Sequence, residues 1–171
     1  MADKVYSIDI NAPIERVWQE VTAPGRVQVH MFGCVLDRCT PGQRYRWHSK
    51  NGKRVFVKGS IVEVSPPKPG AGARFVQTFQ FTTLSDPESL VTWDLSRTGP
   101  SSTKIVVTHS KLEPGSKTAT QIDGGWPSIL STLKSIAETG KAPLGKRIQL
   151  AMMNAMSFVL PKSTLAVNNP E

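Results

Sequence analysis

The segment Gly125–Gly140, GWPSILSTLKSIAETG, carries the clearest helical pattern in this chain. In and just before it, apolar residues recur at spacings of three and four, which places them on one side of a helix. They are Ile122, Trp126, Ile129, Leu130, Leu133, Ile136 and Ala137. Because proline is tolerated in the first turn of a helix and disrupts its middle, Pro127 predicts that the packed helix starts near Gly125, after a looser turn. Gly140 is placed to end it.

The residues before this helix indicate a succession of β-strands. Turn-forming pairs such as Asn51-Gly52 and Gly99-Pro100 separate short runs rich in β-branched and aromatic residues. The runs are Cys34–Arg38, Arg44–His48, Arg54–Val64, Arg74–Thr82, Leu90–Arg97 and Thr103–Leu112. Asn51-Gly52 between two runs is a strong hairpin signal. Six strands with no helix between them predict an antiparallel meander.

The N-terminal part adds a strand and a helix. Val5–Ile10 alternates as a strand does, and a helix is expected from Pro13 to just before Pro24. Residues 27–31 are expected to form a second short helix or a loop. The sequence therefore predicts an α+β fold, in which a seven-stranded antiparallel sheet curls around the long helix and leaves room for a cavity between them.

Several motifs along this order resemble a known family. They are INAPIERVW at residues 10–18, GSIVEVSPP at 59–67, VTWDL at 91–95, STKIVVTH at 102–109 and GWPSILSTLK at 125–134. The order and motifs resemble the START-like (SRPBCC) superfamily, which has the helix-grip fold, and within it the branch of activator of heat shock protein 90 ATPase homologues. The resemblance covers about residues 4–140. It implies a START-like domain at residues 1–140, a C-terminal extension at 141–171, and a link to stress response. The eukaryotic co-chaperone that names the branch has a further domain that this chain has no room for.

Family members of this size mostly look like small proteins with an apolar pocket between the sheet and the long helix. Strand alternation and the helical stripe indicate which residues of this chain would line it. They are Tyr45, Trp47, Gln77, Phe79, Phe81, Trp93, His109, Trp126 and Leu130. The same aromatic residues would also fill a closed core. Gln77 and His109 need hydrogen-bond partners on that apolar face, from protein, water or a ligand.

Catalysis finds little support in the residues, and we expect no catalytic residues, no cofactor and no metal. A nucleophile would need a base beside it, and His30, His48 and His109 are the histidines available. No cluster of His, Cys, Asp or Glu has metal-ligand spacing. Cys34 and Cys39 would point to opposite faces of an extended segment, so we expect two reduced thiols.

Charge is concentrated in one part of the chain. The net charge is +8, and residues 38–74 hold nine Lys or Arg against one acid. Six of them lie on or beside the Asn51-Gly52 hairpin and define a basic patch: Arg44, Arg46, Lys50, Lys53, Arg54 and Lys58. The patch either protects an exposed sheet edge or meets an anionic partner, such as a chaperone or other acidic protein surface. Nucleic acid is not expected, because the exposed face lacks interleaved aromatic residues.

The C-terminal extension carries its own helical pattern. Lys146–Leu160 has apolar residues at helical spacing and further apolar residues beside them, ending at Pro161. They are Ile148, Leu150, Met152, Met153, Ala155, Met156, Phe158 and Val159. We expect this helix to pack on the domain or to form a homodimer, with membrane-surface binding as the lesser alternative. No signal segment or membrane span is expected, which favours the cytoplasm.

Three functions fit these patterns. The first is binding of a small hydrophobic or amphipathic molecule between sheet and helix, without catalysis. The second is a co-chaperone-like interaction module that uses the basic patch. The third is an enzyme of the superfamily, a polyketide cyclase-like or hydrolase activity in the pocket, with His109 as its acid or base.

Overall fold

The computed structural model describes residues 3–155 and 160–170. Its centre is one antiparallel sheet of eight strands in the order β1-β8-β7-β6-β5-β4-β3-β2. Consecutive strands from β2 to β8 are therefore neighbours, and β1 lies beside β8. The strands are β1 (Lys4–Ile10), β2 (Val27–Gln28), β3 (Cys34–Leu36), β4 (Arg44–His48), β5 (Val55–Ser65), β6 (Ala73–Phe81), β7 (Ser89–Gly99) and β8 (Ser102–Ser110).

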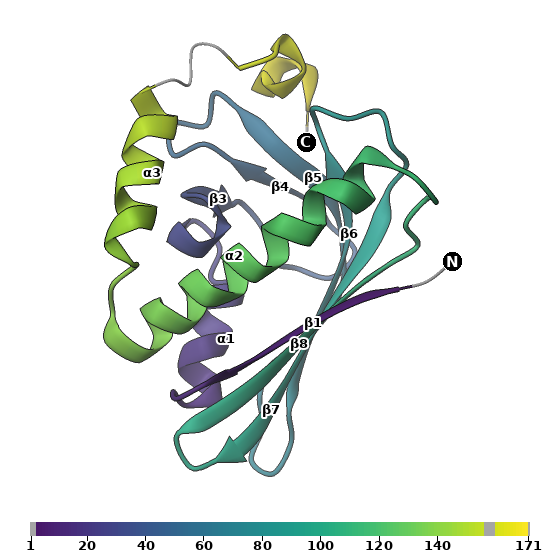
Figure 1. Cartoon of the computed structure of the whole chain (residues 1–171). Coiled ribbons are helices and arrows are strands. Elements are labelled where there is room, and N and C mark those ends of the chain that lie inside the picture. The colour runs from purple at the N-terminus through teal and green to yellow at the C-terminus, as the bar shows by residue number, and fades with distance from the viewer. Residues whose placement is uncertain (1–2, 156–159, 171) are drawn as a thin grey trace.

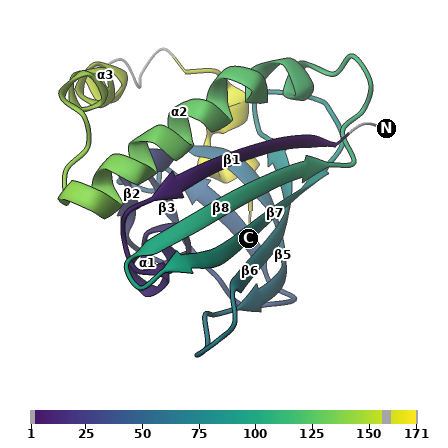
Figure 2. The same ribbon diagram turned by 60° about the horizontal axis from the view of Figure 1, so that its bottom comes forward.

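Helices cover one side of this sheet. The three α-helices are α1 (Ile14–Thr22), α2 (Lys117–Thr139) and α3 (Leu144–Ala155), and short 3-10 turns are η1 (Val29–Met31), η3 (Lys162–Thr164) and η4 (Ala166–Asn168). In Figures 1 and 2, α2 runs along the inner side of the curled sheet, while α1 lies near the C-terminal end of α2. One cluster of buried hydrophobic residues from the sheet and from both helices lies between them. The expected α+β helix-grip architecture is confirmed.

The eighth strand is a correction to the expected seven. Val27 and Gln28 form β2, which pairs with Val35 and Cys34 of β3. Residues 27–31 were expected to be helix or loop, and only the last three of them form a helical turn. Phe32 and Gly33 both adopt left-handed backbone and reverse the chain immediately after that turn. The reversal brings β2 back alongside β3.

The start of α2 also differs from the expectation. The helix begins at Lys117, capped by the Ser116 side chain, which accepts a hydrogen bond from the Ala119 amide at 3.1 Å. Pro127 therefore lies inside the helix. Side chains from other elements hold the turns that precede this proline: Lys4 and Tyr6 of β1 both bond to Asp123. These tertiary contacts offset the backbone hydrogen bond that proline removes.

Gly59 marks a close approach inside the sheet. A Cβ atom built there would lie 2.3 Å from the carbonyl oxygen of Thr78 on β6. Tyr45, the cross-strand partner of Gly59, donates its hydroxyl to that same oxygen at 2.7 Å. A strand glycine commonly marks such a backbone approach. Gly59 thus lets Tyr45 bridge β4 and β6 across β5.

Beyond α2 the chain forms two pieces. The additional helix is confirmed as α3, starting at Leu144, while Met156, Phe158 and Val159 lie outside the described residues. Residues 160–170 then lie against the β4–β5 hairpin, seen at the top of Figure 1. The Arg54 guanidinium donates to the carbonyls of Leu160 and Pro161 and to the Thr164 hydroxyl.

Candidate functional site

The residues expected to line a pocket come together on the inner side of the sheet and on α2. Eight of the nine are buried, and Phe81 is half-buried. Their rings meet mostly edge to face, with centroid separations of 5.4 Å for Tyr45–Trp47, 4.8 Å for Phe79–Phe81 and 5.2 Å for Trp93–Trp126. Such pairs are favourable beyond the area they bury. The group therefore forms a continuous aromatic cluster between sheet and helix.

His109 is held at the centre of this cluster by a chain of hydrogen bonds. Trp126 Nε1 donates to His109 Nδ1 at 3.1 Å, so His109 carries its proton on Nε2. That nitrogen donates to Ser89 Oγ at 2.7 Å, and the serine hydroxyl donates to the Phe79 carbonyl at 3.0 Å. Burial, with a smaller contribution from Lys4, lowers the pKa of His109 to about 4. His109 is neutral at pH 7, and both of its nitrogens have protein partners.

The Ser89–His109 pair does not have the arrangement of a nucleophile and its base. A general base must accept the serine proton, whereas here Nε2 donates to the serine oxygen. The cysteines are no better suited, since burial raises the pKa of Cys34 to about 12 and that of Cys39 to about 11. Both thiols are free, as expected. These contacts fit a binding site or a core better than a nucleophilic centre.

Gln77 and Trp93 differ from their neighbours in their hydrogen bonding. Gln77 has no exposed surface, and within the described part of the chain neither its Oε1 nor its Nε2 has a hydrogen-bond partner. Trp93 Nε1 is likewise buried and has no hydrogen-bond partner among the described residues. Gln77 pairs with Val91 on β7, two residues from Trp93, so all three lie on one face of the sheet, where the Trp93 ring meets Trp126 of α2. Two buried polar side chains without partners in the described chain thus come from neighbouring strands on that face.

The indole of Trp47 is satisfied by a residue that sequence reasoning missed. Its Nε1 donates to Gln28 Oε1 at 2.7 Å, and Gln28 Nε2 donates to the Val21 carbonyl at 2.7 Å. Gln28 was overlooked because residues 27–31 are too short a segment to assign to a strand. The available signal was the alternation of Gln28 and His30 with apolar residues.

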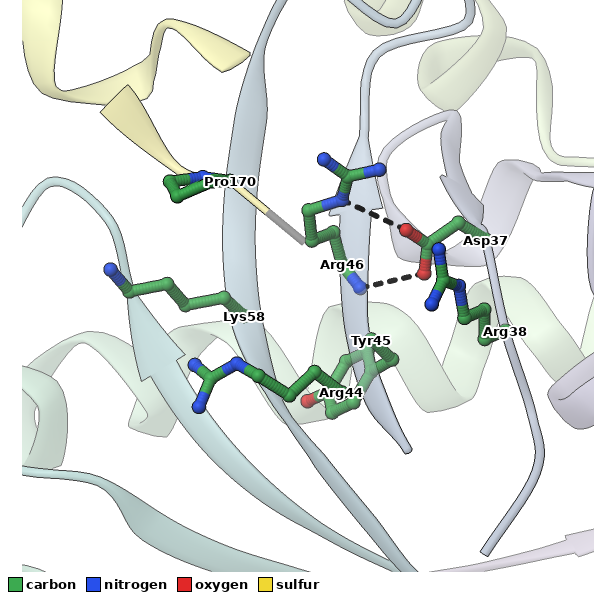
Figure 3. Close-up of a pocket in the computed structure, with 7 residues that line it drawn as sticks. All are labelled: Asp37, Arg38, Arg44, Tyr45, Arg46, Lys58 and Pro170. Carbon is green, nitrogen blue, oxygen red and sulfur yellow. Dashed lines mark hydrogen bonds and ion pairs between the residues drawn. The ribbon is translucent and has the colours of Figure 1, made fainter. Parts of the chain in front are cut away.

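The basic patch divides in the structure. Arg44, Arg46 and Lys58 line a shallow recess together with Asp37, Arg38, Tyr45 and Pro170, with room for about 10 Å³ (Figure 3). Lys50 and Lys53 lie at the exposed hairpin turn, and Arg54 holds residues 160–164. Arg46 is paired with Asp37, whose carboxylate accepts from Arg46 Nε at 2.9 Å and from its backbone amide at 2.7 Å.

Two of the basic side chains in this patch repel each other. Arg46 and Lys58 stand directly opposite on β4 and β5, a like-charge pairing that destabilises a sheet. Asp37 and Arg38, which precede β4, were not assigned to the patch, because the sequence shows no contact between residues 37–38 and that strand. The recess is cationic overall, and residues 160–170 form part of its rim through Pro170.

The described residues form neither a metal-binding cluster nor a helix that could span a membrane. Within the described ranges, no three His, Cys, Asp or Glu side chains gather closely enough to hold a metal ion. Among the helices of those ranges, none combines the length and apolar character needed to cross a membrane.

A curled antiparallel sheet gripping one long helix defines the class as an α+β helix-grip protein. The sequence matches the family described as Activator of Hsp90 ATPase homolog 1-like protein over residues 11–138, which is more than half of the chain. The chain belongs to this family. No match was found among curated proteins.

Solved structures share the fold at low sequence identity. A protein from Mesorhizobium loti is 22% identical with a TM-score of 0.62, covering 79% of this chain and 96% of its own. An HSP90 activator from Plasmodium falciparum is 15% identical with a TM-score of 0.63, covering 80% and 96%. The Aha1 dimer from Colwellia psychrerythraea is 16% identical with a TM-score of 0.64, covering 83% and 100%.

Proposed function

We propose that this protein binds a small, mainly apolar molecule carrying one polar group, between the sheet and α2, without catalysing a reaction. The observation that carries the proposal is Gln77, whose amide is wholly buried and lacks a partner at both ends within the described residues. Leaving a buried polar group unpaired costs about 1–3 kcal/mol. A methionine or leucine would avoid that cost, so the glutamine points to a partner that the protein itself does not supply.

The chemistry of the two polar groups defines what such a partner would carry. Gln77 Nε2 and Trp93 Nε1 can only donate, while Gln77 Oε1 can only accept. A carbonyl, hydroxyl or carboxamide group would meet them. Phe79 and Trp126 are part of the surrounding aromatic cluster, which suits a flat apolar body on the same molecule. His109 favours binding over the cyclase or hydrolase alternative, because both of its ring nitrogens already form hydrogen bonds with protein side chains.

Gln77→Met tests this proposal, because it should make the ligand-free protein more stable and at the same time abolish ligand retention. The free energy of unfolding of the ligand-free protein should rise by about 1–3 kcal/mol, since the unpaired amide is removed. Native mass spectrometry of freshly purified wild-type protein should show a retained small molecule, and Gln77→Met should lose it.

Gln19→Met is the matched control, because Gln19 is exposed on α1 and no residue of α1 belongs to the cluster. This control variant should still carry the small molecule in native mass spectrometry. Wild-type protein that carries no small molecule would overturn the binding proposal. Equal retention by Gln77→Met would remove Gln77 from the site.

A second candidate function is docking on a chaperone through the basic patch. Two observations support it: the family description names an Hsp90 ATPase activator, and Arg44, Lys50 and Lys53 are exposed around the hairpin. Complementary charge accelerates association and is screened by salt. An acidic surface on the chaperone would contact the cationic recess and the hairpin turn together.

Charge reversal should distinguish docking through the basic patch from attraction that depends only on the net positive charge of the protein. The triple variant Arg44→Glu, Lys50→Glu and Lys53→Glu should lower association with an Hsp90 chaperone by about tenfold or more at low salt. Its control reverses Lys68, Lys104 and Lys117, which are also exposed but lie on other elements. Pull-down and surface plasmon resonance measure the effect. Equal binding by the two triple variants would rule out the patch.

A further inference from the structure

The helix α3 is turned with its apolar side outward. Leu144, Ile148 and Met152 are 68%, 54% and 60% exposed. Their spacing of four residues places them in one stripe along the helix. Ala151, beside the stripe, is exposed as well. In Figure 1, α3 stands at the edge of the molecule beside the C-terminal end of α2.

On the inward side of α3, a charged residue contacts the rest of the domain. Lys146 bonds to Ser128 Oγ of α2, and its Nζ lies 5.1 Å from the centre of the Phe32 ring. Leu150 also points inward, with a methyl 3.5 Å from where a Cβ would stand on Gly33. The helix is therefore anchored by these residues, and its apolar stripe is not needed for packing. A surface helix ordinarily buries that stripe.

Charge around the stripe has one sign. Lys141 and Arg147 are exposed next to it. The sequence contains no Asp or Glu between Glu138 and Glu171, and the whole chain has a net charge of +8. Whatever covers the stripe must accept apolar side chains and supply negative charge.

A second copy of this chain fits those requirements poorly. An antiparallel pair of α3 helices centred on Ile148 would place two Arg147 side chains close together, with no acidic residue on either helix. A stable interface also buries about 800 Å² per partner, more than one stripe of three side chains offers. A single convex helix fits another protein only where that protein has a matching groove. A lipid surface needs no such shape.

We propose that the outer face of α3 docks on an anionic membrane surface, with Leu144, Ile148 and Met152 inserted among the acyl chains and Lys141 and Arg147 at the headgroups. The helix is too short to span a bilayer and would lie in its plane. Burying each apolar side chain strengthens the partition by about tenfold, and nearby cations add attraction to acidic lipids. The docking is reversible and does not depend on what the interior binds.

Vesicle flotation of the full chain tests the docking. The protein should float with vesicles of phosphatidylcholine and phosphatidylglycerol at a ratio of about 7 to 3, and not with phosphatidylcholine alone. Ile148→Ser with Met152→Ser should lower the partition coefficient by about a hundredfold. Lys141→Glu with Arg147→Glu should also abolish flotation, and about 0.5 M salt should weaken it.

Val62→Ser with Val167→Ser is the control, since both valines are exposed elsewhere, at 52% and 82%. This control should float like the wild type. Circular dichroism checks that all variants are folded. Absence of flotation with the acidic vesicles, or equal flotation of the stripe variant, would overturn the proposal. A dimer in light scattering that the stripe variant abolishes would also overturn it, in favour of a second copy.

Discussion

Replacing Gly59 with alanine is expected to lower the free energy of unfolding by about 3 kcal/mol or more. The new Cβ would lie 2.3 Å from the carbonyl oxygen of Thr78 and 2.8 Å from its carbonyl carbon. These are backbone atoms, so relief requires β5 and β6 to move apart. That movement would also break the bond from the Tyr45 hydroxyl to the same oxygen.

Gly124→Ala is the matched control for this substitution. Gly124 is exposed within α2, and a Cβ added there would meet no atom of the described residues within 4 Å. Because alanine favours helix over glycine, this variant should gain about 0.5–1 kcal/mol. Urea denaturation measures both. A Gly59→Ala protein within 1 kcal/mol of the wild type would contradict the close approach described for β5 and β6.

A large effect is also expected from pH. Burial, with a smaller contribution from Arg26, lowers the pKa of His30 to about 3, as burial lowers that of His109 to about 4. In the unfolded chain both lie near 6.5. Below pH 6.5 the unfolded chain therefore takes up two protons that the folded protein excludes. The stabilisation that comes from these two neutral histidines is fully present above that pH. It is lost progressively as the pH drops toward 4. Between pH 7.5 and 5 the loss should be about 2 kcal/mol for each histidine.

Single variants assign this loss to each histidine. His30→Gln and His109→Gln should each reduce the slope of unfolding free energy against pH by about one proton between pH 6 and 5, whatever they do to stability at pH 7.5. Proton NMR should show the His109 ring still neutral at pH 5. A single variant with the full wild-type slope would show that the replaced histidine is not excluded from protonation in the folded protein.

Much of the fold could be predicted because it depends on local periodicity. Alternation located β4 at Arg44–His48 to the residue, and spacings of three and four located the buried face of α2. Both periods follow from backbone geometry, so they can be identified before any contact is known. The same parity brought Tyr45, Trp93 and His109 to one face of the sheet.

Contacts between distant segments account for what the sequence analysis missed. Asp123 receives Lys4 and Tyr6 from β1, which lets α2 begin at Lys117 despite Pro127. Arg54 was grouped with the basic patch, yet it binds carbonyls of residues 160 and 161. No pattern within either segment indicates these partners.

Apart from β2, the order of the elements, the faces of the strands and helices, and the family could therefore be inferred from the amino-acid sequence. Which buried polar groups have hydrogen-bond partners, by contrast, depends on the three-dimensional arrangement of the strands and helices. His109 has two partners and Gln77 has none among the described residues, although both are polar residues on the same apolar face. Hydrogen bonding depends on side-chain positions within a few tenths of an ångström, set by strands far apart in the chain. Hydrophobic periodicity carries no such information, because burial is non-directional.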